Sequence, residues 1–407
     1  MLVLQGAFSM SQGLTPSERI VNELSVKSFL KAWTHPNPIG KKNKELCDCL
    51  IVCAEHVIII SVKEIQYKDT GDNIGYERWT KKAIQESAEQ IWGAERWLNS
   101  QKNITRHDKR VVDLPDISER KYHRISVSLG SKCQIPITWG DLGFGFVHVC
   151  DEKSIKVLFE ELDTIIDFTN FLQESENIKN TKMSLIFDGG GIQDLVALYI
   201  QQNHTLDFST DKGQPDLVMI SDDLWDGFSK SQEYKDMKID FKTSYFWDSL
   251  IENYAKDLLT GGMFEMHSKA VTNNELALVT MALQPRRYRA NLADAFIEFM
   301  QKKELKIASR VVLGFNNIAF VFLIGKSSDR EFRSKELLLR CSIIDVKLPK
   351  SKTIIGIATD RPGTSEIGYS SDILYMHDLE RTDEEKAKII ELSKELGYFK
   401  IYNVTKL

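Results

Sequence analysis

The sequence predicts a mixed α/β protein built from more than one domain. Strand-like apolar runs alternate with segments of helical periodicity along the whole chain. At 407 residues, the chain is longer than a single hydrophobic core usually supports. Its composition, 42% hydrophobic and 27% charged, is typical of a folded globular protein.

The first half predicts the order helix, hairpin, helix, two strands, helix. A capping box at 15–18, with Pro16 at the first helical position, starts the first helix. The polar segment 174–182 predicts a domain boundary, so we expect domains at 14–175 and 183–407, with a further division near residue 303 left open. The expected elements are a helix ended by 35–40, a hairpin at 46–64, a long helix at 77–100, strands at 124–130 and 144–150, and a helix at 154–172.

The second half continues the alternation of strands and helices, although its sheet topology cannot be read from the sequence. A strand, a glycine turn and a helix are expected at 184–200, and a second capping box at 382–385 starts the last helix. The other expected elements are strands at 215–220, 237–241 and 353–358, a hairpin at 310–325, and helices at 245–259, 273–302 and 329–340.

Net charge and cysteine content indicate which partners and which cellular compartment the protein has. A net charge of −5 and a pI of about 6.0 exclude a global basic field for nucleic acid or an anionic membrane. Six cysteines, three of them within 46–64, do not resemble a disulfide framework and favour a reducing cytoplasm. The first ten residues lack a signal peptide's basic region, and the apolar run 318–325 is far too short to span a membrane. We therefore expect a cytoplasmic protein without a membrane partner.

The hairpin LCDCLIVCAEHVIIISVKE (46–64) carries an aspartate near its start and a lysine near its end. If its turn is centred on 54–55 with two or four loop residues, Asp48 lies directly opposite Ser61, and Lys63 shares their face. A three-residue loop would shift the register by one residue and separate them. The three cysteines, at 47, 49 and 53, lie on the other face and lack zinc-ligand spacing.

Two charges on one face of an apolar hairpin require an explanation, because burying either without a partner is costly. One explanation is a salt bridge between Asp48 and Lys63. The other is a metal site, in which Asp48 holds Mg²⁺ or Mn²⁺ and Lys63 orients a water molecule or stabilises charge on a phosphate.

Glu23 on the first helix, Asp48, and the run Ser61-Val62-Lys63 together resemble the PD-(D/E)XK, restriction-endonuclease-like nuclease superfamily over residues 14–175. This resemblance implies a mixed sheet flanked by helices, followed here by a second mixed α/β region. It implies an Mg²⁺-dependent endonuclease that hydrolyses phosphodiester bonds, with DNA favoured over RNA. Asp48, Glu23 and the backbone carbonyl of Val62 would serve the metal, and Lys63 would position the attacking water.

By analogy with fusions in this superfamily, the chain would be a bacterial restriction or anti-phage defence effector. Its C-terminal region would then restrain the nuclease. The same region would bind a regulatory partner or self-associate. The alternative is a catalytically inactive nuclease-fold protein that binds nucleic acid or another protein. The missing carboxylate at Ser61 and the acidic pI favour that alternative.

Ser61 departs from the family pattern, which usually has a carboxylate or glutamine at this position. Some members with serine recruit a glutamate from the next helix, thirteen residues beyond the lysine, and that position here is Glu77. Glu77 falls on a helical stripe with 81, 84, 88, 91 and 98, so we expect it to face inward as a second metal ligand. A glutamate favoured by the helix dipole at an N-terminus is the alternative.

Other clusters of residues compete with this site. Arg78, Lys81 and Lys82 would contact a phosphate backbone or only solvent.

The PD-(D/E)XK motif is also matched letter by letter at 215–216 and 240–242, but an expected helix lies between its two parts. The glycine turn 188–191 would cradle a phosphate or form a tight turn into a helix. The basic cluster of Arg286, Arg287 and Arg289 would contact nucleic acid, an acidic partner or solvent.

Overall fold

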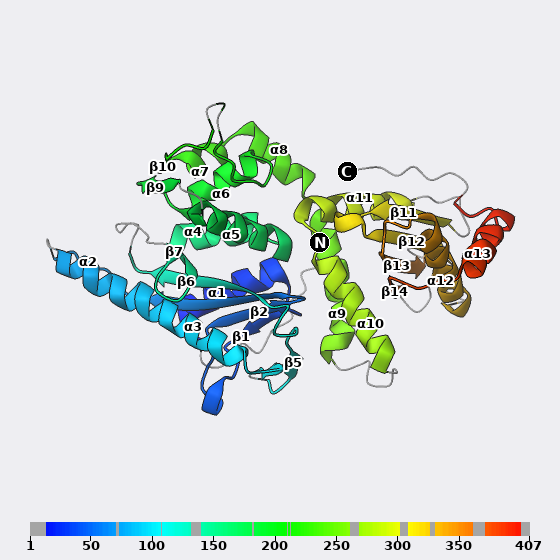
Figure 1. Cartoon of the computed structure of the whole chain (residues 1–407), viewed down its shortest axis with the longest axis horizontal. Coiled ribbons are helices and arrows are strands. Elements are labelled where there is room, and N and C mark those ends of the chain that lie inside the picture. Colours follow the sequence, from blue (N-terminus) through cyan, green and yellow to red (C-terminus); the bar gives the residue numbers. More distant parts are fainter. Residues whose placement is uncertain are drawn as a thin grey trace. The chain divides into compact units, whose positions relative to one another are not determined.

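A computed structural model of the chain contains two compact units, Met1–Lys235 and Asp236–Leu407, which are described separately (Figure 1). The division falls within one helix, α8 (Gln232–Asp240). The structure describes residues 14–70, 73–106, 108–131, 140–180, 183–209, 211, 213–260, 268–301, 308–325, 330–360 and 371–399.

The core of the first unit is a six-stranded mixed sheet, in the order β1-β2-β3-β6-β8-β7. Strands β1, β2 and β3 pair antiparallel, whereas β3, β6 and β8 run parallel to one another. The predicted mixed α/β class is therefore confirmed. The bounds are β1 Thr34–Pro36, β2 Cys49–Cys53, β3 His56–Glu64, β6 Lys121–Leu129, β7 Gly140–Asp141 and β8 Phe146–Cys150, with a separate pair of β4 Asn103–Thr105 and β5 Val111–Asp113.

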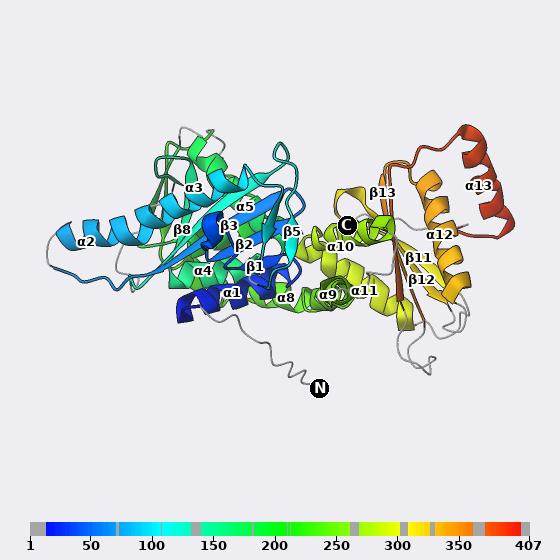
Figure 2. The ribbon, with the colours of Figure 1, turned by 90° about the horizontal axis from the view of Figure 1, so that it is seen from below.

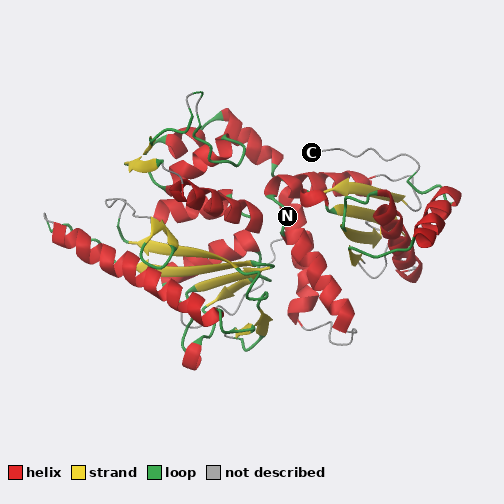
Figure 3. Ribbon diagram, viewed as in Figure 1, coloured by secondary structure: helices red, strands yellow, loops and turns green. Residues whose placement is uncertain are grey.

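Helices cover both faces of this sheet (Figures 2 and 3). The long helix packs apolar side chains on Leu50, Val52 and Ile59 of the hairpin. On the opposite face, Ser25 of the first helix reaches Cys49. The first helix starts with the predicted capping box. The helices are α1 Pro16–Phe29, the short η1 Lys41–Asn43, the long helix of α2 Asn73–Thr80, η2 Lys81–Gln85 and α3 Glu86–Leu98, and then α4 Glu152–Glu161 and α5 Ile165–Asn180.

The first unit extends beyond the expected domain boundary. Residues 174–180 of that polar segment belong to α5, and the chain up to Lys235 groups with the sheet that precedes it. Here β9 and β10 pair in parallel beside α6, which packs on α4. The bounds are β9 Ser184–Asp188, α6 Ile192–Gln201, β10 Leu217–Ser221 and α7 Leu224–Phe228.

The second unit is built on a mixed four-stranded sheet, in the order β11-β12-β13-β14. The expected hairpin is the antiparallel pair β11-β12, and α12 connects β12 to the parallel strand β13. Leu337 of α12 packs on one face, while Trp247 and Phe296 pack on Phe322 of the other. The bounds are β11 Ala308–Leu313, η3 Phe315–Asn317, β12 Ala319–Gly325, β13 Thr353–Asp360, β14 Ser371–His377, α9 Ser244–Thr260, α10 Ser268–Ala282, α11 Arg286–Gln301, α12 Arg330–Lys347 and α13 Asp383–Glu395.

Two expectations for the second half are wrong. Of residues 237–241, expected as a strand, 237–240 end helix α8. The N–H of Phe241 donates to the carbonyl of Met237 at 3.0 Å, which is the spacing of one helical turn. The helical stretch 273–302 is two helices, α10 and α11, and Pro285 stands between them. Proline lacks the N–H that a continuous helix would need at that position.

Candidate active site

The hairpin of β2 and β3 has the predicted register. Cys53 pairs with His56 across a two-residue turn, in which Ala54 adopts a φ of 50°. Asp48 immediately precedes β2, so continuation of the Cys49–Ile60 pairing by one step places it beside Ser61. Both are buried, with Asp48 only 5% exposed, and Lys63 on the same face is half-buried. The hairpin therefore brings together Asp48, Ser61 and Lys63 at the carboxyl end of β3.

The carboxyl group of Asp48 is held by the backbone of β3. The N–H of Val62 donates to Asp48 Oδ2 at 2.6 Å. Burial raises the pKa of Asp48, and the nearby charge of Glu18 adds to that shift, while the Val62 N–H and the Lys63 ammonium oppose it. We expected the carbonyl of Val62 to serve a metal, but the contact present is between its N–H and Asp48.

A second carboxylate, Glu45, accompanies Asp48, and it was not among the residues predicted from the sequence. Glu45 lies in the loop after η1, where its backbone bridges Ile39. Although the residue as a whole is exposed, desolvation of its carboxyl group raises its pKa to about 7, with further contributions from the negative charge of Asp48 and a hydrogen bond between the two side chains. The signal in the sequence was an acidic residue three positions before Asp48, in a loop whose path the sequence does not predict.

Helix α1 turns Glu18, rather than Glu23, toward this pair. The buried side of α1 carries Ser17, Val21 and Ser25, and Glu23 lies about 200° around the helix from Val21 and is exposed. Glu18 lies close enough for its charge to act on both Asp48 and Glu45. The expected role of Glu23 beside the metal is therefore wrong.

Glu77 does not face the sheet either. It is exposed, as is Lys81, while Gly75, Trp79 and Ile84 are buried. The long helix contains a π-helical turn at η2, where the N–H of Glu86 donates to the carbonyl of Lys81, five residues earlier. The extra residue in this turn rotates the preceding part of the helix, so the stripe expected from Glu77 turns outward. The placement of Glu77 as an inward ligand is wrong.

Gln90 of α3 meets Ser61 at the position where a carboxylate was expected. The hydroxyl of Ser61 donates to Gln90 Oε1 at 3.2 Å. Beside it, Ser126 of β6 donates to Ser87 at 2.9 Å, and Ser128 donates to the carbonyl of Ala83 at 2.9 Å. The contact between the sheet and the long helix is thus lined by hydroxyl and amide groups next to Lys63.

The cationic side chains expected to contact nucleic acid are all on the outer side of the long helix. Arg78 belongs to α2, and Lys81 and Lys82 to η2, and all three are exposed. This exposure is compatible both with a phosphate contact and with simple solvation. Their contact with nucleic acid stays a prediction.

The competing motifs have structural roles. Asp216 precedes strand β10, but Asp240 ends helix α8, so the two do not form a strand pair. At the glycine turn, Asp194 Oδ2 accepts the N–H of Gly191 at 2.9 Å, as an anion would at a helix N-terminus. A Cβ on Gly190 would lie 2.5 Å from the carbonyl oxygen of Ser221. The glycines therefore allow a tight turn against the strand that follows.

The basic cluster in the first turn of α11 is largely buried. Arg286 and Arg289 donate to the two carboxylate oxygens of Asp248 at 2.7 and 2.5 Å, and only Arg287 is exposed. Because their guanidinium groups are occupied inside the second unit, Arg286 and Arg289 hold α9 to α11. They are not a surface for nucleic acid.

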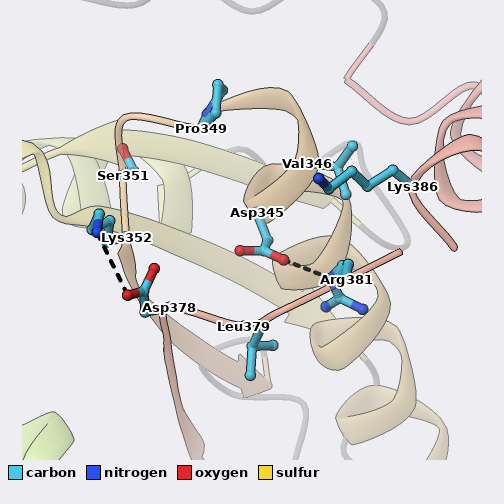
Figure 4. A pocket seen from close by; sticks show the side chains of 9 residues that line it. All are labelled: Asp345, Val346, Pro349, Ser351, Lys352, Asp378, Leu379, Arg381 and Lys386. Atoms are coloured by element: carbon cyan, nitrogen blue, oxygen red, sulfur yellow. Dashed lines mark hydrogen bonds and ion pairs between the residues drawn. The ribbon is translucent and has the colours of Figure 1, made fainter. Parts of the chain in front are cut away.

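The second unit also contains a cavity of about 250 Å³ (Figure 4). Arg381 pairs with Asp345 at 2.6 Å, and Lys352 faces Asp378 at 3.5 Å. These charged side chains in the wall of the cavity therefore largely neutralise one another. The lining residues are Asp345, Val346, Pro349, Ser351, Lys352, Asp378, Leu379, Arg381 and Lys386.

Comparisons of the chain with protein-family models, curated proteins and solved structures found no match of any kind. In the part of the chain that the structure describes, no three His, Cys, Asp or Glu side chains are grouped so that they could hold a metal ion. No described helix is both long and apolar enough to cross a membrane.

Proposed function

We propose that the chain is a metal-dependent nuclease of the PD-(D/E)XK type that hydrolyses phosphodiester bonds in nucleic acid, with DNA favoured over RNA. The observation that carries the proposal is the carboxyl pair of Glu45 and Asp48, which share a hydrogen bond within reach of the charge of Lys63. The mixed sheet with helices on both faces supports it further. By analogy with the superfamily, the chain would act in bacterial restriction or anti-phage defence, in the cytoplasm.

The donor set suits Mg²⁺ or Mn²⁺, because these hard cations prefer carboxylate oxygens. The raised pKa values of Glu45 and Asp48 indicate that neither group is fully compensated by its protein neighbours. A divalent cation between them would replace the proton that they otherwise share. The ion would supply Lewis-acid stabilisation of phosphate charge and a more acidic water molecule.

The remaining groups of the site then have distinct tasks. The Val62 N–H fixes the orientation of the Asp48 carboxylate through its 2.6 Å hydrogen bond. Lys63, on the same face, would bind a phosphate oxygen or orient the attacking water molecule. Glu18 would add negative charge at the edge of the site, where α1 begins.

A non-catalytic binding module is the second candidate, and the hydrogen bond between Ser61 and Gln90 is the observation that favours it. Serine stands where the superfamily usually places a metal-ligating carboxylate, and the group that meets it from the long helix is an amide. If the fold has lost catalysis, nucleic acid or a protein would still bind, and no metal would promote cleavage.

Plasmid cleavage in the presence of Mg²⁺ or Mn²⁺ tests the proposed function. The purified chain is expected to nick or degrade the DNA, and Asp48→Ala and Lys63→Ala are each expected to slow cleavage by at least about a hundredfold. Glu23→Ala is the matched control, since it removes an exposed carboxylate on α1 and should leave the rate unchanged. Absence of cleavage with either metal, or normal cleavage by the Asp48 and Lys63 variants, would refute the proposal.

A further inference from the structure

The cavity of the second unit lies at one end of its sheet, where α12 and β14 end and β13 and α13 begin (Figure 4). Because β13 and β14 pair antiparallel, Lys352 just before β13 stands beside Asp378 just after β14. The N–H of Asp378 donates to the carbonyl of Lys352 at 2.8 Å. Asp345 comes from the last turn of α12, Arg381 from the segment before α13, and Lys386 from the start of α13. Four separate elements therefore bring these charged groups around one space.

Each of the two carboxylates in the cavity wall has one oxygen left for a ligand. Asp345 Oδ2 accepts from the Nε of Arg381 at 2.6 Å, and Asp378 Oδ2 accepts from the ammonium group of Lys352 at 3.5 Å. Within the described residues, no group donates to the second oxygen of either carboxylate. Figure 4 shows these two oxygens pointing into the space between Asp345 and Asp378. The cavity thus offers two acceptors to a ligand that carries N–H donors.

Lys386 and Ser351 offer donors to the same space. The ammonium group of Lys386 lies 3.7 Å from a carboxylate oxygen of Asp383, a fully exposed residue, which is too far for a hydrogen bond. Ser351 is only 4% exposed and lines the cavity, and its hydroxyl has no hydrogen-bond partner among the described residues. A buried hydroxyl without a partner is disfavoured in a folded protein, so it is expected to meet a ligand or an ordered water molecule.

The size and the mixed charge of the cavity limit what it can bind. Its volume of about 250 Å³ corresponds to about eight water molecules at ~30 Å³ each, which is the size of a free amino acid. Val346, Pro349 and Leu379 add apolar surface to the wall. A ligand with only negative charge would face the two free carboxylate oxygens, and one with only positive charge would leave the ammonium group of Lys386 unpaired.

We propose that this cavity binds a small zwitterion of the amino-acid class. The ammonium group of the ligand lies between Asp345 and Asp378, and its carboxylate faces Lys386. Ser351 adds a neutral hydrogen bond, and the apolar wall accommodates the side chain of the ligand. All these residues belong to the second unit, so this assignment does not depend on the nuclease activity proposed for the first.

Calorimetric titration of the full chain with each of the twenty common amino acids tests the proposal. Acetate, inorganic phosphate and methylamine are the comparison probes, because each carries charge of one sign only. At least one amino acid is expected to bind about tenfold or more tightly than any of the three, since only a zwitterion forms charge-assisted hydrogen bonds on both sides of the cavity. Absence of binding by all twenty, or phosphate binding as tightly as the best amino acid, would overturn the assignment.

Asp378→Asn and Lys386→Gln test whether the amino acid binds in this cavity. Both side chains are at least half exposed, so the variants should fold, and each should weaken binding of the best amino acid about tenfold. Lys388→Gln is the matched control, because Lys388 is an exposed lysine of the same helix outside the cavity wall, and its affinity should equal that of the wild type. Wild-type affinity in either cavity variant would contradict the proposal.

Discussion

At the scale of single residues, neighbouring groups shift the pKa values of the carboxyl groups of Asp48 and Glu45 in opposite directions. Burial and negative neighbours raise the pKa values of Asp48 and Glu45, while the Val62 N–H lowers that of Asp48 and the Lys63 ammonium lowers both. With a pKa of about 7, Glu45 retains a proton under mildly acidic conditions. A cation must displace that proton, so metal binding and protonation compete for the same oxygen atoms.

Buried histidines form a second group of titratable residues, on the opposite face of the sheet. His56 Nδ1 and His123 Nε2 lie 3.1 Å apart, and His148 Nε2 lies 3.1 Å from Glu176 Oε1. Burial lowers the pKa of His123 to about 3, with smaller contributions from His56 and His148. Burial also lowers the pKa values of His56 and His148.

Stability is expected to fall as the pH falls, because of these histidines. Between pH 6.5 and about 3, the unfolded chain binds a proton at His123 that the folded chain excludes. His123 contributes a slope of about 1.4 kcal/mol per pH unit in this window. The thermal midpoint should therefore drop from pH 7.5 to pH 5, and the drop should be smaller in His123→Gln. An equal drop in both proteins would contradict the neutral buried state of His123.

At the scale of elements, the hairpin could be predicted because a two-residue turn determines every pairing that follows. Apolar runs on both sides of Ala54 left few alternative registers, so Asp48 and Lys63 could be placed on one face from the sequence alone. Strand β1 was missed, because a three-residue strand that ends in a proline resembles a helix stop.

The long helix shows where a sequence-based argument fails. A uniform period of 3.6 residues places Glu77 inward, but the π-helical turn at 81–85 adds a residue that no periodicity count contains. The one available signal was Trp79, which is out of phase with the expected stripe. It is buried, and its indole N–H donates to the carbonyl of Ile65 at 2.6 Å. Burying this tryptophan stabilises the fold more than an inward orientation of Glu77 would, so Trp79 determines how this part of the helix is turned.

At the scale of the whole molecule, the chain divides at 235/236, whereas the polar segment 174–182 suggested an earlier boundary. A boundary inferred from polarity alone was misleading, because the exposed side of α5 is polar while Phe168 and Phe171 on its other side are fully buried. All the residues of the candidate site belong to the first unit.

The first unit is expected to fold and act without the second. A fragment of residues 1–235 should show a cooperative thermal transition and cleave plasmid DNA at least as fast as the full chain, if the second unit restrains the nuclease. Rates per mole of folded protein are to be compared. A folded fragment that cleaves more slowly than the full chain would show that the second unit contributes to catalysis instead.

The central claim is that the second carboxylate of the site comes from the loop before β2 and not from the long helix. Plasmid cleavage with Mn²⁺ by Glu45→Gln and Glu77→Gln, each compared with the wild type, tests it most directly. Glu45→Gln is expected to lose about a hundredfold in rate, because it removes one carboxylate of the pair, and Glu77→Gln should cleave normally. Loss of cleavage in Glu77→Gln together with normal cleavage by Glu45→Gln would contradict the account.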